Sequence, residues 1–162
     1  MVRRAFGAAA LLVCLFVSCS LLPAQTGKTI TIRILDGKSG ELVTPSNFMV
    51  RINHLKAVHM DWVRQNDDGT TVLTIPADAT VVSIRATYDN SMEYYVNCDA
   101  AGEKNTFDEH WYAVSEVLTD GIVTPNDCVK PKVAERIKTT AKPGEFVFYV
   151  RQMKWHERQQ DY

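Results

Sequence analysis

The chain has 162 residues, of which 18 are Lys or Arg and 19 are Asp or Glu, so its formal net charge is −1. Its basic residues are dispersed along the sequence. This argues against a nucleic-acid partner, because such proteins concentrate Lys and Arg on one face. A chain of this length fits a single domain with a substantial hydrophobic core.

The first 24 residues are organised like a secretory signal peptide. Arg3 and Arg4 precede an apolar run from Ala5 to Val17, and small and polar residues follow it. The run is shorter than the roughly 20 apolar residues that a membrane-spanning helix needs. We therefore expect residues 1–24 to be removed and no membrane span in the mature chain. The expected location is secreted, periplasmic or at the cell envelope.

Two processing sites compete at the end of this segment. Cleavage after Ala24 would release the protein, because Ala24 is a small residue of the kind that precedes the cut. The segment 16–19 instead resembles a lipoprotein box, and processing there would leave a lipid anchor on Cys19. That pattern usually has Leu where this chain has Phe16. Release is therefore the expected route, and a lipid anchor is the alternative.

The rest of the sequence alternates short apolar strands with turns. Period-two patterns predict strands at 30–35, 48–52, 71–75, 82–88, 92–98 and 146–151. Residues 54–65 and 111–118 fit either a strand or a short helix. Many short strands with frequent turns predict an all-β protein. We expect an antiparallel β-sandwich of about seven strands, transthyretin-like or Ig-like.

A long polar stretch precedes the last predicted strand. Residues 99–143 are rich in loops and turns, so we expect an insertion there. Loops carry sites while the scaffold carries stability, so a particular function would reside in this region, as a lid or a site. The expected organisation is a signal peptide at 1–24, one domain at 25–151 and a C-terminal tail at 152–162.

The cysteines suggest one disulfide. Cys14 and Cys19 lie in the signal segment, which leaves Cys98 and Cys128. Two cysteines in an exported domain most simply pair with each other. Closing a loop of this length would stabilise the fold by ~3–4 kcal/mol. No CxxC spacing exists, and no histidine is close in sequence to either residue, so a metal or redox pair is the less favoured interpretation.

Part of the chain resembles a known family. The strand and turn at 32–43, the strand 48–52, and Asp68-Gly69-Thr70 followed by 72–76 are similar to the opening of carboxypeptidase regulatory-like domains. The resemblance covers residues 29–88. It implies a transthyretin-like (prealbumin-like) sandwich with a non-catalytic accessory, adhesion or binding role, the peptidase being a separate domain.

Catalytic and metal-binding motifs are absent from the sequence. There is no Gly-x-Ser-x-Gly elbow, no HExxH pair and no glycine-rich phosphate loop. Asp108 and His110 are weak metal-ligand candidates, which His59 and Asp61 would join if the fold brought them together. Their spacing matches no common site, so we expect no metal and no cofactor.

Aromatic residues are the remaining candidates for ligand contact. We expect Tyr95 and Tyr149 on strand faces opposite the core, and Trp111 and Tyr112 in the insertion. Packing in the core or over sheet edges is the favoured interpretation of the aromatic residues in general, and Tyr95 and Tyr149 are the better candidates for exposed contact.

The sequence therefore predicts an exported, non-catalytic module that binds a protein or polysaccharide or is structural. The alternatives are a small extracellular enzyme acting on polysaccharide and an envelope lipoprotein. Two acids facing each other across a cleft would favour the enzyme, and an aromatic patch on a flat sheet face would favour binding.

Overall fold

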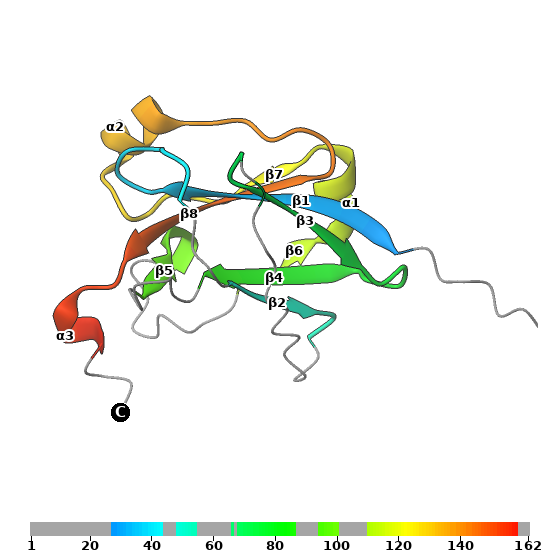
Figure 1. Cartoon of the computed structure of the whole chain (residues 1–162). Coiled ribbons are helices and arrows are strands. Elements are labelled where there is room, and N and C mark those ends of the chain that lie inside the picture. The colour runs from blue at the N-terminus through cyan, green and yellow to red at the C-terminus, as the bar shows by residue number, and fades with distance from the viewer. Residues whose placement is uncertain are drawn as a thin grey trace, which may run out of the picture.

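The computed structural model describes residues 27–43, 48–54, 66, 68–86, 94–100 and 110–158. Figure 1 shows its strands in two layers. The strands are β1 (Lys28–Asp36), β2 (Phe48–Ile52), β3 (Thr70–Ile75), β4 (Val81–Ala86), β5 (Tyr95–Asn97), β6 (Tyr112–Ala113), β7 (Ile122–Val123) and β8 (Glu145–Gln152). The helices are η1 (Cys98–Ala100), α1 (Val114–Thr119), α2 (Pro131–Ala134), η2 (Glu135–Ile137) and α3 (Trp155–Arg158).

Several predictions made from the sequence lie outside these residues. They are the signal peptide at 1–24 with Cys19, and residues 55–65 with His59 and Asp61. The predicted ambiguity at 111–118 is resolved within the described part, because β6 is a short strand and α1 a short helix directly after it.

The predicted mostly β, two-sheet fold is confirmed, but the strands are not all antiparallel. A three-stranded sheet has the order β2-β4-β6, and a five-stranded sheet has the order β3-β1-β8-β5 with β7 also paired to β8. β8 runs parallel to both β1 and β7, with Ile32 and Ile122 each opposite Phe146. The expectation of a purely antiparallel sandwich was therefore wrong.

The parallel pairing explains where the predicted insertion goes. Adjacent parallel strands cannot be joined by a tight hairpin and need a crossover of a dozen or more residues. Residues 124–144 form that crossover between β7 and β8, and we call them the covering segment. In Figure 1 its helix α2 lies over the five-stranded sheet, on the side away from β4.

A single core fills the space between the two sheets. The alternating residues Ile30, Ile32 and Ile34 of β1 point into it and are about 1% exposed. The facing sheet contributes the buried side chains Phe48, Val50, Val82, Ile84 and Ala86. Each Val, Ile or Phe side chain removed from water stabilises the fold by about 1.5–3 kcal/mol, so this core accounts for the main cohesion of the two layers.

A second apolar cluster lies on the outer face of the five-stranded sheet. Leu35, Cys98, Val147 and Tyr149 are buried there, and Val123, Cys128 and Ala141 pack against them. As a result β8 is buried on both faces from Phe146 to Val150. Five consecutive apolar residues are the usual pattern of a strand covered on both sides, as in parallel sheets.

The predicted disulfide between Cys98 and Cys128 is present, with 30 residues of sequence separation. It joins the end of β5 to the covering segment. Asp36 positions the neighbouring turn, since its Oδ1 accepts the backbone N–H groups of Lys38 and Ser39 at 2.8 Å. Gly37 then lies against the disulfide, where a Cβ atom would be 2.7 Å from the Sγ of Cys98.

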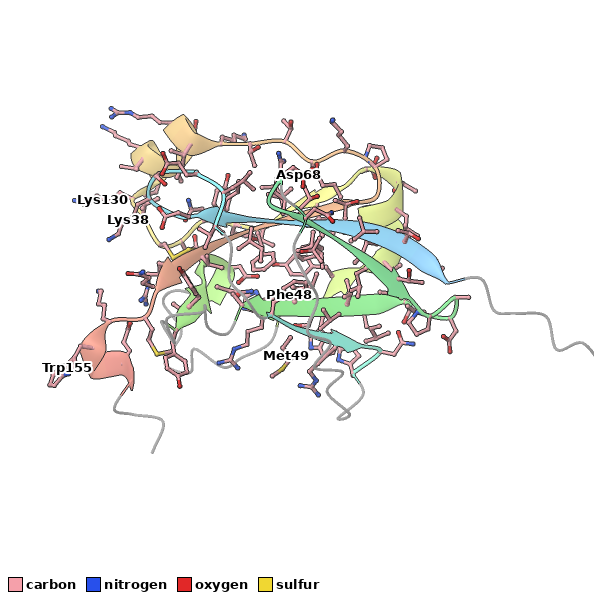
Figure 2. All side chains as sticks on the ribbon, in the orientation of Figure 1. Lys38, Phe48, Met49, Asp68, Lys130 and Trp155 are labelled. Atoms are coloured by element: carbon pink, nitrogen blue, oxygen red, sulfur yellow. A yellow bond between two sulfur atoms is a disulfide. The ribbon has the colours of Figure 1, made fainter. Side chains whose placement is uncertain are left out.

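The first part of the predicted tail continues the fold. β8 extends to Gln152, and Met153, the next residue, is buried. Arg151 donates two hydrogen bonds to the carboxylate of Glu157 on α3, at 2.7 and 2.8 Å. Trp155 is 72% exposed and projects from α3 into solvent in Figure 2. The ion pair therefore fastens α3 to the last strand.

We predict that Gly37→Ala destabilises the protein by about 1–3 kcal/mol, because the added methyl group meets a packed disulfide. The measurement is urea unfolding of the wild type and variant. The cost should fall when Cys98 and Cys128 are both replaced by Ala, because the obstructing sulfur atoms are then gone. An equal cost in both backgrounds would show that the disulfide is not what excludes a side chain at Gly37.

We predict a pH-dependent contribution from Glu157. Its hydrogen bonds to Arg151 lower its pKa from the ordinary 4.5 to about 2. Because the pKa is lower in the folded state, the stabilisation is fully present above pH 4.5 and is lost as the pH falls toward 2. Glu157→Gln should cost up to about 1 kcal/mol at neutral pH, since the pair is partly solvated.

Thermal unfolding between pH 2 and 7 tests this effect. The gap between wild type and Glu157→Gln should close as the pH falls, whereas Glu116→Gln, at an exposed position on α1, should change stability little at any pH. A gap that stayed constant down to pH 2 would contradict the assignment.

Candidate functional site

Tyr149 is not the exposed contact residue that the sequence predicted. It does lie on the outer face of β8, but it is 3% exposed because the covering segment packs over it. Its hydroxyl donates a hydrogen bond to the carbonyl of Ile137 at 3.1 Å. The expectation of exposure was therefore wrong, and Tyr149 instead helps to hold the covering segment on the sheet.

Tyr95 was also assigned to the wrong face. It is half-buried and packs against the core between the sheets. Cys98, three positions further along and directly after β5, belongs to the outer cluster, where the disulfide holds it. Because neighbouring strand residues point to opposite faces, the position of Cys98 on the outside places Tyr95 on the inside.

Tyr112 packs from β6 against the core between the two sheets, and it contacts both β8 and η1. Its ring packs edge-on against Phe146 with ring centroids 5.0 Å apart. Its hydroxyl donates a hydrogen bond of 2.5 Å to Oδ2 of Asp99, which is 7% exposed. Burial, followed by the hydrogen bond and charge of Asp99, raises the pKa of Tyr112 far above its ordinary value. Tyr112 is therefore placed as a structural partner of Asp99.

Trp111 directly precedes β6 and contacts β2 and the residues that follow β2. Its ring is 4.1 Å from that of His54, and the guanidinium carbon of Arg51 is 5.7 Å from the ring centroid. Trp111 is half-buried in this arrangement. Its role as a ligand contact stays a prediction.

The structure describes only one of the weak metal-ligand candidates. His110 is half-buried just before β6, while Asp108, like His59 and Asp61, lies outside the described residues. Within the described part of the chain, no group of three or more His, Cys, Asp or Glu side chains is arranged to hold a metal ion.

The structure brings a different set of residues together in a cavity of about 630 Å³ beside the covering segment. Most of its lining comes from the segment itself, and Tyr149 contributes from the sheet. The lining residues are Val123, Thr124, Pro125, Asn126, Asp127, Val129, Pro131, Ala134, Glu135, Lys138, Thr139 and Tyr149. This volume is in the range of cavities that hold small molecules.

Several bonds hold the walls of this cavity. Near the disulfide, the backbone N–H of Asp127 donates to the carbonyl of Cys98 at 3.1 Å. The side chain of Asn126 donates to the carbonyl of Gly37 at 2.9 Å. At the other end Arg33 donates to the carbonyl of Thr140 at 2.7 Å. The crossover is thus attached to the sheet at both ends.

Charges of both signs line the cavity. Asp127, Glu135 and Lys138 are exposed, and among the described residues none of the three side chains forms an ion pair. The wall also contains two buried polar atoms without a hydrogen-bond partner in the described part, Thr124 Oγ1 and Asn126 Oδ1. Such groups are uncommon in folded proteins.

The cavity lies within the region that the sequence predicts to be a lid or a site, but the sequence did not single out the cavity residues. That region is 99–143, and eleven of its residues between Val123 and Thr139 line the cavity. The unbroken apolar run 146–150 was the available signal for a strand covered on both faces.

No protein-family model, curated protein or solved structure matches the chain. The resemblance to carboxypeptidase regulatory-like domains therefore stays a prediction from residues 29–88. Within the residues that the structure describes, no helix has the length and apolar character that a membrane span requires.

We predict that Tyr112→Phe costs about 1–3 kcal/mol of unfolding free energy, because the buried carboxylate of Asp99 loses a hydrogen-bond donor. Urea unfolding measures the loss. In the wild type the stability should also fall as the pH rises above 10, since the unfolded phenol ionises near 10.0 while the folded one stays protonated.

Tyrosinate absorbance provides the control for Tyr112→Phe. The native variant should lose no amplitude from the ionisation step near pH 10, because Tyr112 does not contribute to it. A smaller step in the variant would show that Tyr112 titrates as an ordinary exposed tyrosine and would contradict its burial against Asp99.

Proposed function

We propose that the protein is an exported, non-catalytic binding module that takes its ligand in the cavity that the covering segment forms with Val123 and Tyr149. The observation that carries this proposal is the cavity itself, which has a volume of about 630 Å³. The covering segment that forms most of its wall is attached to the sheet at both ends. A rigid scaffold that presents loop residues around a concave site is the usual arrangement of binding proteins.

We further propose that the two sheets form a transthyretin-like sandwich of the carboxypeptidase regulatory-like kind. The Asp36 turn supports this, together with the strands on either side of it, because they occur in the order that the family pattern requires. The parallel pairing of β1 with β8 is a feature that the sequence pattern did not suggest. The accessory role of that family agrees with a binding function.

The proposal of export rests on residues 1–24 and on the disulfide. A disulfide is typical of proteins in oxidising compartments, such as the periplasm or the cell exterior. The Cys98–Cys128 bond therefore supports a secreted, periplasmic or envelope location. Release after Ala24 and lipidation at Cys19 both agree with it, and the lipoprotein remains the alternative.

One observation favours a second candidate function, a small enzyme acting on polysaccharide. Asp127 and Glu135 both line the cavity, and glycoside hydrolases commonly use two carboxyl groups on either side of the bond they cleave. A sugar polymer would enter the same cavity in both cases. The two functions differ in whether the bound polymer is cleaved.

We predict that filling the cavity removes binding. Ala134 lines it, whereas its neighbour Val133 on α2 is exposed and does not. Ala134→Trp should therefore abolish binding of any probe that the wild type binds, and Val133→Trp should leave binding unchanged. Calorimetric titration with soluble oligosaccharides and short peptides gives the affinities.

The same titrations separate the two candidate functions. A binding module returns its probe chemically intact by mass spectrometry. Cleavage products that disappear in Asp127→Asn or Glu135→Gln would establish the enzyme instead. Equal binding by Ala134→Trp and wild type would show that the cavity is not the ligand site.

A further inference from the structure

We propose that the ligand of the cavity carries an ammonium group and a carboxylate on an apolar body, as a free amino acid or a short peptide with free ends does. This inference rests on the proposed function, since it concerns the same cavity. It specifies the chemistry of the ligand from the chemistry of the lining.

Two carboxylates and one ammonium group line this cavity. Asp127 and Glu135 supply negative charge and Lys138 supplies positive charge, and these three side chains make no ion pair among the described residues. A ligand with one charge of each sign can pair with both. A purely anionic or purely cationic ligand would be attracted by one part of the lining and repelled by the other.

Asp127 and Lys138 lie near different anchoring points of the covering segment, while Glu135 lies on η2 close in sequence to Lys138. Asp127 directly precedes Cys128 of the disulfide; its backbone N–H donates to the carbonyl of Cys98, and its charge adds to the effect of buried Asp99 on Tyr112. Lys138 follows Ile137, whose carbonyl accepts the hydrogen bond from Tyr149. The lining thus carries a negative group beside the disulfide, and groups of both signs, Glu135 and Lys138, on either side of Ile137.

Apolar side chains form much of the remaining wall. They belong to Val123, Pro125, Val129, Pro131 and Ala134. Aliphatic and prolyl surfaces of this kind would cover the side chain of an amino acid and remove it from water. The volume of about 630 Å³ leaves room for more than a single small group. The lining therefore combines an apolar surface with charges suited to both ends of a peptide.

The hydroxyl of Thr124 adds an independent observation. Thr124 lines the cavity and is 3% exposed, and its Oγ1 has no hydrogen-bond partner in the described part of the chain. A buried hydroxyl without a partner is costly. A small shift of the Thr124 side chain would let a polar ligand form a hydrogen bond with Oγ1. A purely apolar ligand would leave Oγ1 without a partner.

An anionic polymer is the competing ligand, because exposed basic residues lie on the covering segment, close in sequence to residues that line the cavity. The exposed cations Lys130, Lys132 and Arg136 lie on the covering segment. Lys38 projects from the turn that packs against Cys128, and Figure 2 shows Lys38 and Lys130 at the same end of the molecule. Asp127 and Glu135 oppose a polyanion inside the cavity itself, so we favour the zwitterionic ligand and test the polyanion directly.

The test uses calorimetry and amide chemical shifts of the oxidised protein with defined probes. The zwitterionic probes are leucine, alanyl-leucine and alanyl-alanyl-leucine. The blocked probes are the same molecules with an acetylated amino end or an amidated carboxyl end. Cellotetraose represents a neutral sugar, and an oligogalacturonate represents a polyanion. Comparing the affinity for leucine with the affinity for the two peptides shows whether the ligand is a free amino acid or a short peptide.

We expect the unblocked probes to bind and each blocking group to weaken binding by at least about threefold, the scale of one solvated ion pair. In Lys138→Gln, probes with a free carboxyl end and probes with an amidated carboxyl end should bind equally, because the positive partner is gone. In the double variant Asp127→Asn with Glu135→Gln, probes with a free amino end and probes with an acetylated amino end should bind equally, because the negative partners are gone. The matched controls Lys132→Gln and Glu116→Gln lie outside the cavity lining and should keep both preferences.

Each other outcome has a definite meaning. Blocked and free peptides binding equally to wild type, or oligogalacturonate or cellotetraose binding in place of the peptides, would overturn the zwitterionic ligand while leaving the cavity as a binding site. If no probe shifts the amide resonances of residues 123–139, this inference and the proposed function both fail. Peptide binding that Ala134→Trp does not affect would place the ligand elsewhere and overturn both.

Discussion

The disulfide between Cys98 and Cys128 is the constraint on which the outer layer of this protein depends. It ties the end of β5 to the crossover that lies over the five-stranded sheet. Gly37 is adjacent to it, with no space for a side chain, and the carbonyl of Gly37 accepts a hydrogen bond from Asn126. The turn, the last residues of β5 and the covering segment are therefore fixed to one another at a single point, and the cavity lies beside that point.

The topology of β8 explains why a covering segment is needed at all. β8 pairs in parallel with β7, so the chain must leave the sheet and return before β8 begins. The returning residues pack on Val147 and Tyr149 and complete the burial of β8 on its second face. A connection that a parallel pair requires thus forms most of the wall of the cavity. Loops placed on a rigid sheet in this manner often acquire binding functions.

The local parts of the fold could be predicted from the sequence, and the long-range parts could not. Period two located the strands at 30–35, 48–52 and 71–75, and the presence of two cysteines after residue 24 predicted the disulfide. Strand direction was missed, because alternation carries no information about which strands become neighbours. The faces of Tyr95 and Tyr149 were misjudged because the disulfide and the covering segment make the outside of the sheet a second buried surface. The cavity residues carry no motif, and only the crossover brings them together.

Hydrogen–deuterium exchange of the protein with and without the disulfide tests the central claim, that this bond holds the covering segment on the sheet. In the oxidised protein the amides of Thr124 and Asp127 should be protected, because they bond to Val147 and Cys98. In Cys98→Ser with Cys128→Ser, amides of residues 124–140 should exchange at least about tenfold faster while β1 and β8 remain protected, as expected for local opening. Unchanged exchange in residues 124–140, or equal loss of protection in β1 and β8, would contradict the account.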